Sequence, residues 1–179
     1  MTSYRSAALL LAASIALLAG CASGVSRQDV TAPAHRLSAN QKLNSATLSL
    51  TPEVKAKLDE NIKFNPDNLA TMINRRLELN DLSAKGASYS LHVVIKDVRV
   101  RQTVTAVLFG FLAGADSIAG DVELKDATGK VVDRFEISAS YALGGWGGGQ
   151  DDTRMNWLYE EFSKLLIVEL KGESAKAKE

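Results

Sequence analysis

Cysteine and histidine are both scarce in this sequence. The 179 residues include one cysteine, Cys21, and two histidines, His35 and His92. A single thiol excludes any disulfide within the chain. Neither histidine has cysteine, aspartate or glutamate placed to share a metal ion or relay a proton, so we interpret His35 as a solvated linker residue and His92 as a structural residue on a strand. We therefore expect no metal, no cofactor and no enzymatic activity.

The sequence also lacks an excess of charge and a long apolar run. Lys and Arg total 21 and Asp and Glu total 21, for a formal net charge of +0. We expect no nucleic-acid partner, because binding phosphates requires a basic surface that displaces counterions. The apolar runs at 7–18 and 104–115 are each about twelve residues long. A helix that crosses a bilayer needs about 20 apolar residues, so neither run predicts one.

The first apolar run has the properties of a secretory signal. It follows Arg5, and its length falls in the roughly 7–15 residues typical of the core of a signal peptide. It ends at Leu18-Ala19-Gly20-Cys21, which resembles a bacterial lipobox. That resemblance implies that Cys21 is alkylated by a diacylglyceryl group and becomes the first residue after cleavage. We predict a signal peptide at 1–20 and attachment to a membrane through an N-terminal lipid on Cys21.

The residues after the cysteine predict a destination and a tether. The two or three acyl chains that the lipobox resemblance implies hold a protein stably, at about 0.8 kcal/mol per buried methylene. Ala22 stands where an aspartate would favour retention in the inner membrane, so the same resemblance favours the outer membrane over the inner membrane. From 21 to 44 the chain is polar and has few large apolar residues. We interpret this segment as a flexible tether with a reach of about 27 Å.

A strand and two helices are predicted next. A β-prone run at 46–50 is followed by Thr51-Pro52, a pair typical of the N-cap and first turn of a short helix. A second helix begins after Asn65-Pro66-Asp67 and ends near Leu82. Its apolar residues recur at helical spacing: Leu69, Met72, Ile73 and Leu77.

The segment 89–103 predicts a strand with one irregularity. Its apolar residues alternate up to Ile95 and then shift by one position beyond Asp97. A β-bulge near Lys96 and Asp97 would correct this slip and turn the charged residues that follow toward solvent. The alternative is a second half that is buried on both faces, with the arginines reaching solvent along their stems.

A hairpin and a long helix are predicted toward the end of the chain. The segments 118–125 and 131–141 alternate between apolar and polar residues, and Asp126-Ala127-Thr128-Gly129 between them is typical of a turn. A helix then runs to Lys171-Gly172, with Glu160 four residues before Lys164 as an ion pair. Its apolar face consists of Met155, Leu158, Phe162, Leu165 and Leu166.

Two segments fit no regular element. Val104–Ala115 is either a buried strand end with a hairpin loop or an exposed loop that meets a partner or the membrane. The glycines beside Phe109 and Phe111 favour partial exposure of these rings. The glycine-rich segment around Trp146 lacks the spacing of a phosphate-binding loop. We treat Phe109, Phe111 and Trp146 as a candidate interaction loop.

The order β, α, α, β, β, β, α predicts an α+β fold, with a small antiparallel sheet of about four strands and helices packed on one face. We assign this single domain to 45–172 and a charged tail to 173–179. The chain also resembles a family of uncharacterised bacterial envelope lipoprotein domains over about residues 89–170. Three features carry the resemblance: Gly110-Phe111-Leu112-Ala113-Gly114, the stretch from Asp126 to Val132, and a glycine-rich loop before a helix.

This resemblance implies an envelope location and supplies no catalytic residues. We expect a non-catalytic interaction or assembly module at the periplasmic face of the outer membrane, with an envelope protein as candidate partner. The alternative is a carrier of a small apolar ligand or lipid, with 104–115 as a lid over a pocket between sheet and helix. An enzyme ranks third, because neither histidine lies near a nucleophile elbow such as GxSxG.

Lipidation of Cys21 is the first testable prediction. Cys21→Ser removes the thiolate that alkylation requires. We expect radiolabelled fatty acid to enter the wild-type protein and not this variant, and we expect the variant to be soluble in the periplasm or to remain uncleaved. Equal labelling of the two proteins would refute the anchor.

Overall fold

The computed structural model describes residues 23–28, 34–60, 63–101, 114–142 and 151–173. Its strands come in two groups, each followed by one or two helices. In order they are β1 (Gly24–Ser26), β2 (Leu43–Leu50), α2 (Pro52–Asp59), α3 (Pro66–Leu79), β3 (Tyr89–Arg99), β4 (Asp116–Lys125), β5 (Val131–Tyr141) and α5 (Asp151–Lys171). No helix in the described ranges combines the length and the apolar character needed to cross a membrane.

The strands form one open sheet in the order β1-β5-β4-β3-β2. This mixed α/β arrangement agrees broadly with the predicted fold class and differs from it in two respects. The sheet has five strands instead of about four, and β2 pairs with β3 in parallel. Two helices lie between β2 and β3 in sequence, and a crossover of that kind returns the chain to the same end of the sheet before the next strand begins.

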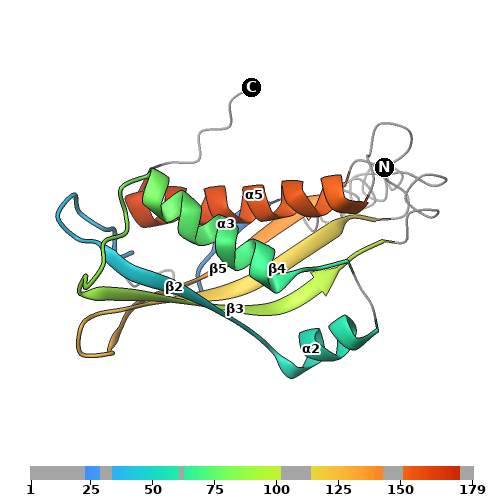
Figure 1. The fold of residues 1–179 in the computed structure, drawn as a ribbon, viewed down its shortest axis with the longest axis horizontal. Helices are drawn as coiled ribbons and strands as arrows, with labels where there is room; N and C mark the ends of the chain where they lie inside the picture. Colours follow the sequence, from blue (N-terminus) through green and yellow to red (C-terminus); the bar gives the residue numbers. More distant parts are fainter. Residues whose placement is uncertain (1–22, 29–33, 61–62, 102–113, 143–150, 174–179) are drawn as a thin grey trace, which may run out of the picture.

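One face of the sheet is covered by α3 and α5, which pack against each other (Figure 1). Figure 1 shows α2 apart from this layer, at the end of β2. The core lies between the sheet and the two covering helices. Its fully buried large apolar residues include Leu43, Leu69, Ile73, Leu77, Leu91, Ile95, Ile118, Leu124, Ile137, Tyr159 and Phe162.

Local chemistry explains where the two short helices begin. Thr51 is the N-cap of α2 and accepts from the backbone N–H of Val54, and Asn65 caps α3 in the same way. The Asn65 N–H donates to the Tyr159 hydroxyl at 2.7 Å, which joins the start of α3 to α5. On α3, the Asn74 amide bonds both the N–H and the C=O of Ala46. These bonds satisfy backbone groups on the edge strand β2 that would otherwise be open.

The predicted irregularity in β3 is confirmed. The register between β3 and β4 shifts between Ile95 and Asp97. After the shift, Val98 is buried and Asp97 and Arg99 are exposed, as a bulge requires. Arg101 differs from the prediction, because it is buried instead of turned to solvent.

The hairpin and the last helix agree with the sequence patterns. Asp126 accepts from the N–H groups of Thr128 and Lys130, and Gly129 has a φ of 83°, a left-handed conformation that suits glycine. All the residues predicted for the apolar face of α5 are buried. The ion pair predicted for Glu160 is wrong: Lys164 pairs with Glu161 instead, at 3.1 Å and one residue closer.

The described part of the predicted tether is packed on the domain, which corrects its interpretation as a free linker. Gly24–Ser26 forms β1 on the outer edge of β5. Leu37 is 7% exposed, and its N–H donates to the Leu170 carbonyl at 2.9 Å. A strand added to an open edge gains backbone hydrogen bonds without large side chains, and composition does not reveal such pairing. The domain therefore includes residues upstream of the predicted boundary at 45.

Leu37 provides a test of this packing. We expect Leu37→Ala to lower the free energy of unfolding by about 2–3 kcal/mol, because a buried leucine leaves a cavity. The exposed Asn40→Ala is the control and should change it by less than about 0.5 kcal/mol. Chemical denaturation of the protein without residues 1–20 and with Cys21→Ser measures both. Equal stability of the two variants would mean that the segment is not held by the domain.

Candidate functional site

The residues predicted to act as sites lie outside the described ranges. These are Cys21, Phe109, Phe111 and Trp146. The structure does describe the residues that flank the segments 102–113 and 143–150. Asp116 at the start of β4 pairs with Tyr141 at the end of β5. The two segments therefore leave and rejoin the domain at one end of the sheet.

Among the described residues, three charged side chains form a buried cluster at this end. The Asp116 carboxylate lies between two arginines, Arg101 after β3 and Arg154 on the first turn of α5. Arg101 Nη2 lies 3.1 Å and Arg154 Nε lies 2.8 Å from Asp116 Oδ2. The side chains of the three residues are 0–3% exposed. Charges this deeply buried are stable only when they are paired and hydrogen-bonded.

The same cluster binds the backbone on both sides of it. The Arg101 N–H donates to Asp116 Oδ1 at 2.6 Å, and the Arg101 guanidinium donates to the carbonyls of Gly114 and Tyr141. Arg154 Nη2 donates to the carbonyl of Arg101 at 3.0 Å. The described residues that flank the two segments are thus bonded to one charged network. This network fixes β3, β4, β5 and α5 relative to one another at this end.

A second group of charges ties the N-terminal segment to the domain. Arg27 follows β1 and donates to Asp133 on β5 at 2.5 Å and to Glu169 on α5. Its guanidinium lies 5.2 Å from the centre of the Phe135 ring. The hydrogen bond to Asp133 raises the pKa of Arg27 above its ordinary value against the effect of burial, and Glu169 adds to the rise. Asp133 also accepts from the N–H of His35 at 3.1 Å.

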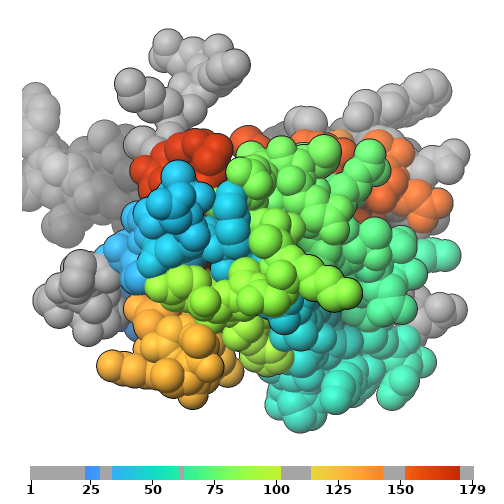
Figure 2. Space-filling model, turned by 60° about the vertical axis from the view of Figure 1, so that its left-hand side comes forward, coloured from blue at the N-terminus to red at the C-terminus, as the bar shows by residue number. Residues whose placement is uncertain are grey.

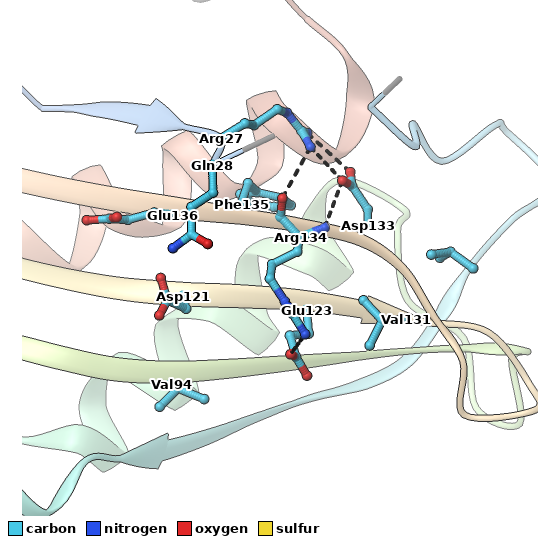
Figure 3. A pocket seen from close by; sticks show the side chains of 11 residues that line it. Arg27, Gln28, Val94, Asp121, Glu123, Val131, Asp133, Arg134, Phe135 and Glu136 are labelled. Atoms are coloured by element: carbon cyan, nitrogen blue, oxygen red, sulfur yellow. Dashed lines mark hydrogen bonds and ion pairs between the residues drawn. The ribbon is translucent and has the colours of Figure 1, made fainter. Parts of the chain in front are cut away.

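Arg27 borders a hollow of about 590 Å³ on the open face of the sheet (Figure 3). Figure 3 shows Asp121, Glu123 and Glu136 on neighbouring strands across this face. Each of these carboxylates has a cationic partner. Lys96 lies 2.9 Å from Asp121 and 2.8 Å from Glu136, and Arg134 lies 2.5 Å from Glu123.

These pairings favour the ionised forms of Glu123 and Lys96. A hydrogen bond from Lys125 lowers the pKa of the Glu123 carboxyl, with a smaller contribution from Arg134. Burial lowers the pKa of Lys96, but its bonds to Glu136 and Asp121 outweigh burial and leave the pKa above its ordinary value. A carboxylate held ionised by a neighbouring cation is a poor general acid at neutral pH.

The two histidines have different surroundings. His92 lies on β3 with its ring nitrogens 2.9 Å from Thr47 Oγ1 and 3.2 Å from Ser49 Oγ, which agrees with a structural role. His35 is half-buried, with its ring 5.6 Å from that of Tyr89, so it is not the solvated linker residue that was expected. Within the described ranges, no group of three or more His, Cys, Asp or Glu side chains is arranged to hold a metal ion.

Sequence reasoning missed the buried cluster. Asp116 directly follows the apolar segment 104–115, and Arg154 lies in a helix whose apolar residues dominate the sequence pattern. The one available signal was Arg101. It lies on the same alternate positions of the sequence as the residues that are buried before the bulge. A charged residue at a position where the alternation predicts burial indicates either an error in the assumed register or a buried ion pair. The partner in such a pair is distant in sequence, so the sequence does not identify it.

The fold and these sites together define a small mixed α/β domain with one helix-covered face and one charged open face. The chain belongs to the family described as a domain of unknown function (DUF4410), which matches residues 25–145. The match begins inside β1, in agreement with a domain that includes the N-terminal strand. A comparison with curated proteins finds no match.

Solved structures similar to this chain include PelC from Paraburkholderia phytofirmans, a dodecamer, in two crystal forms. The form in space group P6 has 15% identity and a TM-score of 0.51, and covers 82% of this chain and 96% of that chain. A variant in space group C2 has 16% identity and a TM-score of 0.50, and covers 84% and 98%. The minor lipoprotein from Acinetobacter baumannii has 11% identity and a TM-score of 0.40, and covers 72% and 93%. The likeness to PelC shows a shared fold.

The buried cluster gives a prediction about stability. Asp116→Asn leaves two buried guanidinium groups without their shared carboxylate, and we expect it to lower the free energy of unfolding by about 3 kcal/mol or more. Asp121→Asn, on the open face beside Lys96, is the matched control and should cost less than about 1 kcal/mol. Urea denaturation of the two variants provides the comparison. A loss for Asp116→Asn no larger than that of the control would mean that the cluster does not hold this end of the sheet.

Proposed function

We propose that this protein is a lipid-anchored protein of the cell envelope that acts as a non-catalytic interaction or assembly module, at the periplasmic face of the outer membrane. The observation that carries the anchor is the stretch Leu18-Ala19-Gly20-Cys21 after a short apolar leader. Its cysteine is the single one in the chain, so the thiol has no disulfide partner. Ala22 supports the outer membrane as the destination.

The choice of a contact module over an enzyme is supported by the pairing of charges. Asp121, Glu123, Asp133 and Glu136 around the hollow each face a lysine or an arginine. Nucleophilic or general-base chemistry requires a side chain with reactive capacity left over, and these groups are committed to one another. A face of paired charges suits a polar partner surface.

A carrier of an apolar ligand is less well supported by the described residues. The space between the sheet and the covering helices is filled by one cluster of buried apolar side chains. The hollow of about 590 Å³ lies on the other face and is lined by both charged and apolar side chains, among them Arg27, Asp121 and Val94. An apolar ligand gains most from an apolar pocket. PelC, which shares this fold, is a dodecamer, and that supports assembly as the form that the interaction takes here.

The partner surface is proposed to include Phe109, Phe111 and Trp146. We expect Phe109→Ser with Phe111→Ser to abolish capture of the partner while changing the free energy of unfolding by less than about 1 kcal/mol. If the two rings are core residues instead, each substitution should cost about 3 kcal/mol or more.

Crosslinking in intact cells, followed by identification of the crosslinked protein, measures capture, and chemical denaturation measures stability. Phe64→Ser, which removes a buried ring from the described core, is the control for a variant that fails by unfolding. A loss of stability comparable with that of the control would end the interaction-loop proposal.

A further inference from the structure

The residue two positions after Cys21 is fixed to the end of the sheet. The Ser23 hydroxyl accepts from the Ser140 N–H at 2.9 Å and donates to the Ser140 carbonyl at 3.4 Å. Directly after it, Gly24 pairs with Ser138 as β1 joins β5. Ser140 is the penultimate residue of β5, so the N-terminal segment is attached at the same end of the sheet as the Asp116 cluster.

This attachment makes the connection to the lipid very short. Two peptide units extend over at most about 7 Å, so an anchor on Cys21 lies within that distance of Ser23. A free tether of 21–44 would instead allow about 27 Å. If Cys21 carries the lipid, as proposed above, the end of the sheet at Ser140 and Tyr141 cannot move away from the headgroups. This inference rests on that proposal.

The side chains at this end suit contact with a bilayer surface. Trp157 on α5 is 38% exposed, and its ring centre lies 5.1 Å from that of Tyr141. Tryptophan favours the headgroup region, where an apolar ring and a polar tip are both accommodated. Tyr141 is buried, so it supports the Trp157 ring from the core side. Arg99 at the end of β3 is exposed. Its guanidinium lies against Gly114, just before β4, where an added Cβ would be only 2.8 Å from Nη2. A cation there suits anionic lipid headgroups.

The opposite end of the domain provides a contrast. The described part of the chain has two exposed large apolar residues, Trp157 and Leu79. Leu79 is the last residue of α3, near the connection where the Leu43 N–H donates to the Leu82 carbonyl and β2 begins. Figure 2 brings this opposite end forward, with β2 and the start of β3 beside the turn that joins β4 to β5. The chain offers no anchor near it in the described residues.

We infer that the domain rests on the bilayer by the end of the sheet that holds Ser23, with Trp157 at headgroup depth and Leu79 directed away from the membrane. The lipid on Cys21 sets the distance, and the Ser23–Ser140 pair sets the orientation. The Asp116 cluster then lies directly behind the docking surface and keeps it rigid. The segments 102–113 and 143–150 leave the domain on the same side.

Fluorescence quenching tests this orientation. The full chain, purified with its native N-terminus, is inserted into vesicles of phosphatidylethanolamine and phosphatidylglycerol that contain a phosphatidylcholine brominated near the top of its acyl chains. Trp146→Phe leaves Trp157 as the single tryptophan, since the chain has 2. We expect a large loss of emission from Trp157. The matched reporter, Leu79→Trp with Trp146→Phe and Trp157→Phe, should keep its emission.

Flotation of the vesicles separates the failure of the anchor from the failure of the orientation. Protein that does not float lacks the anchor, which overturns both this inference and the proposed function. Protein that floats without quenching of Trp157, or with stronger quenching at position 79, overturns the orientation alone. A long Gly/Ser insertion between Ala22 and Ser23 should preserve flotation and reduce the quenching of Trp157. Unchanged quenching there would show that the short connection is not what holds the domain down.

Discussion

The interaction between Asp116 and two arginines determines how one end of this domain is built. The carboxylate is fully buried, and Arg101 and Arg154 reach it from β3 and α5. Each guanidinium also donates to a backbone carbonyl. The cluster therefore both neutralises the buried charges and holds the strand ends in place. An apolar cluster could fill the same volume, but it could not satisfy the carbonyls where the sheet pairing ends. The cost of burying these charges is offset only while all three are in place.

The rest of the sheet is stabilised in a more ordinary way. Apolar residues from β3, β4 and β5 pack against α3 and α5, and the open face carries alternating acidic and basic side chains. The bulge between Ile95 and Asp97 lies between the apolar part of the sheet and its charged end. It turns Arg99 outward and allows Val98 to enter the core. The two edges are treated differently: β5 is covered by β1, and β2 is bonded by Asn74 from α3. Both devices satisfy backbone groups that an open edge would expose.

The N-terminal segment connects the proposed anchor to the fold. Ser23, Arg27 and Leu37 are bonded in turn to β5, to the Asp133 and Glu169 carboxylates and to the end of α5. A chain attached in this way cannot act as a free spacer. It transmits the position of its first residue to the sheet, so a lipid on Cys21 would orient the domain as well as retain it. Such coupling suits a module that is held in one orientation at the membrane.

The sequence by itself determined most of the elements and little of the site. Local signals were sufficient where the cause is local: Thr51 as a cap, the phase slip near Asp97, the turn at Asp126 and Gly129, and the apolar face of α5. The tertiary structure decided what depends on distant partners. The parallel pairing of β2 with β3, the strand at Gly24 and the cluster around Asp116 each join residues far apart in the chain, and they use backbone groups or single charges that leave no periodic pattern. Periodicity reports how a segment meets the core, whereas pairing across a sheet edge or a buried ion pair is decided only when the segments meet.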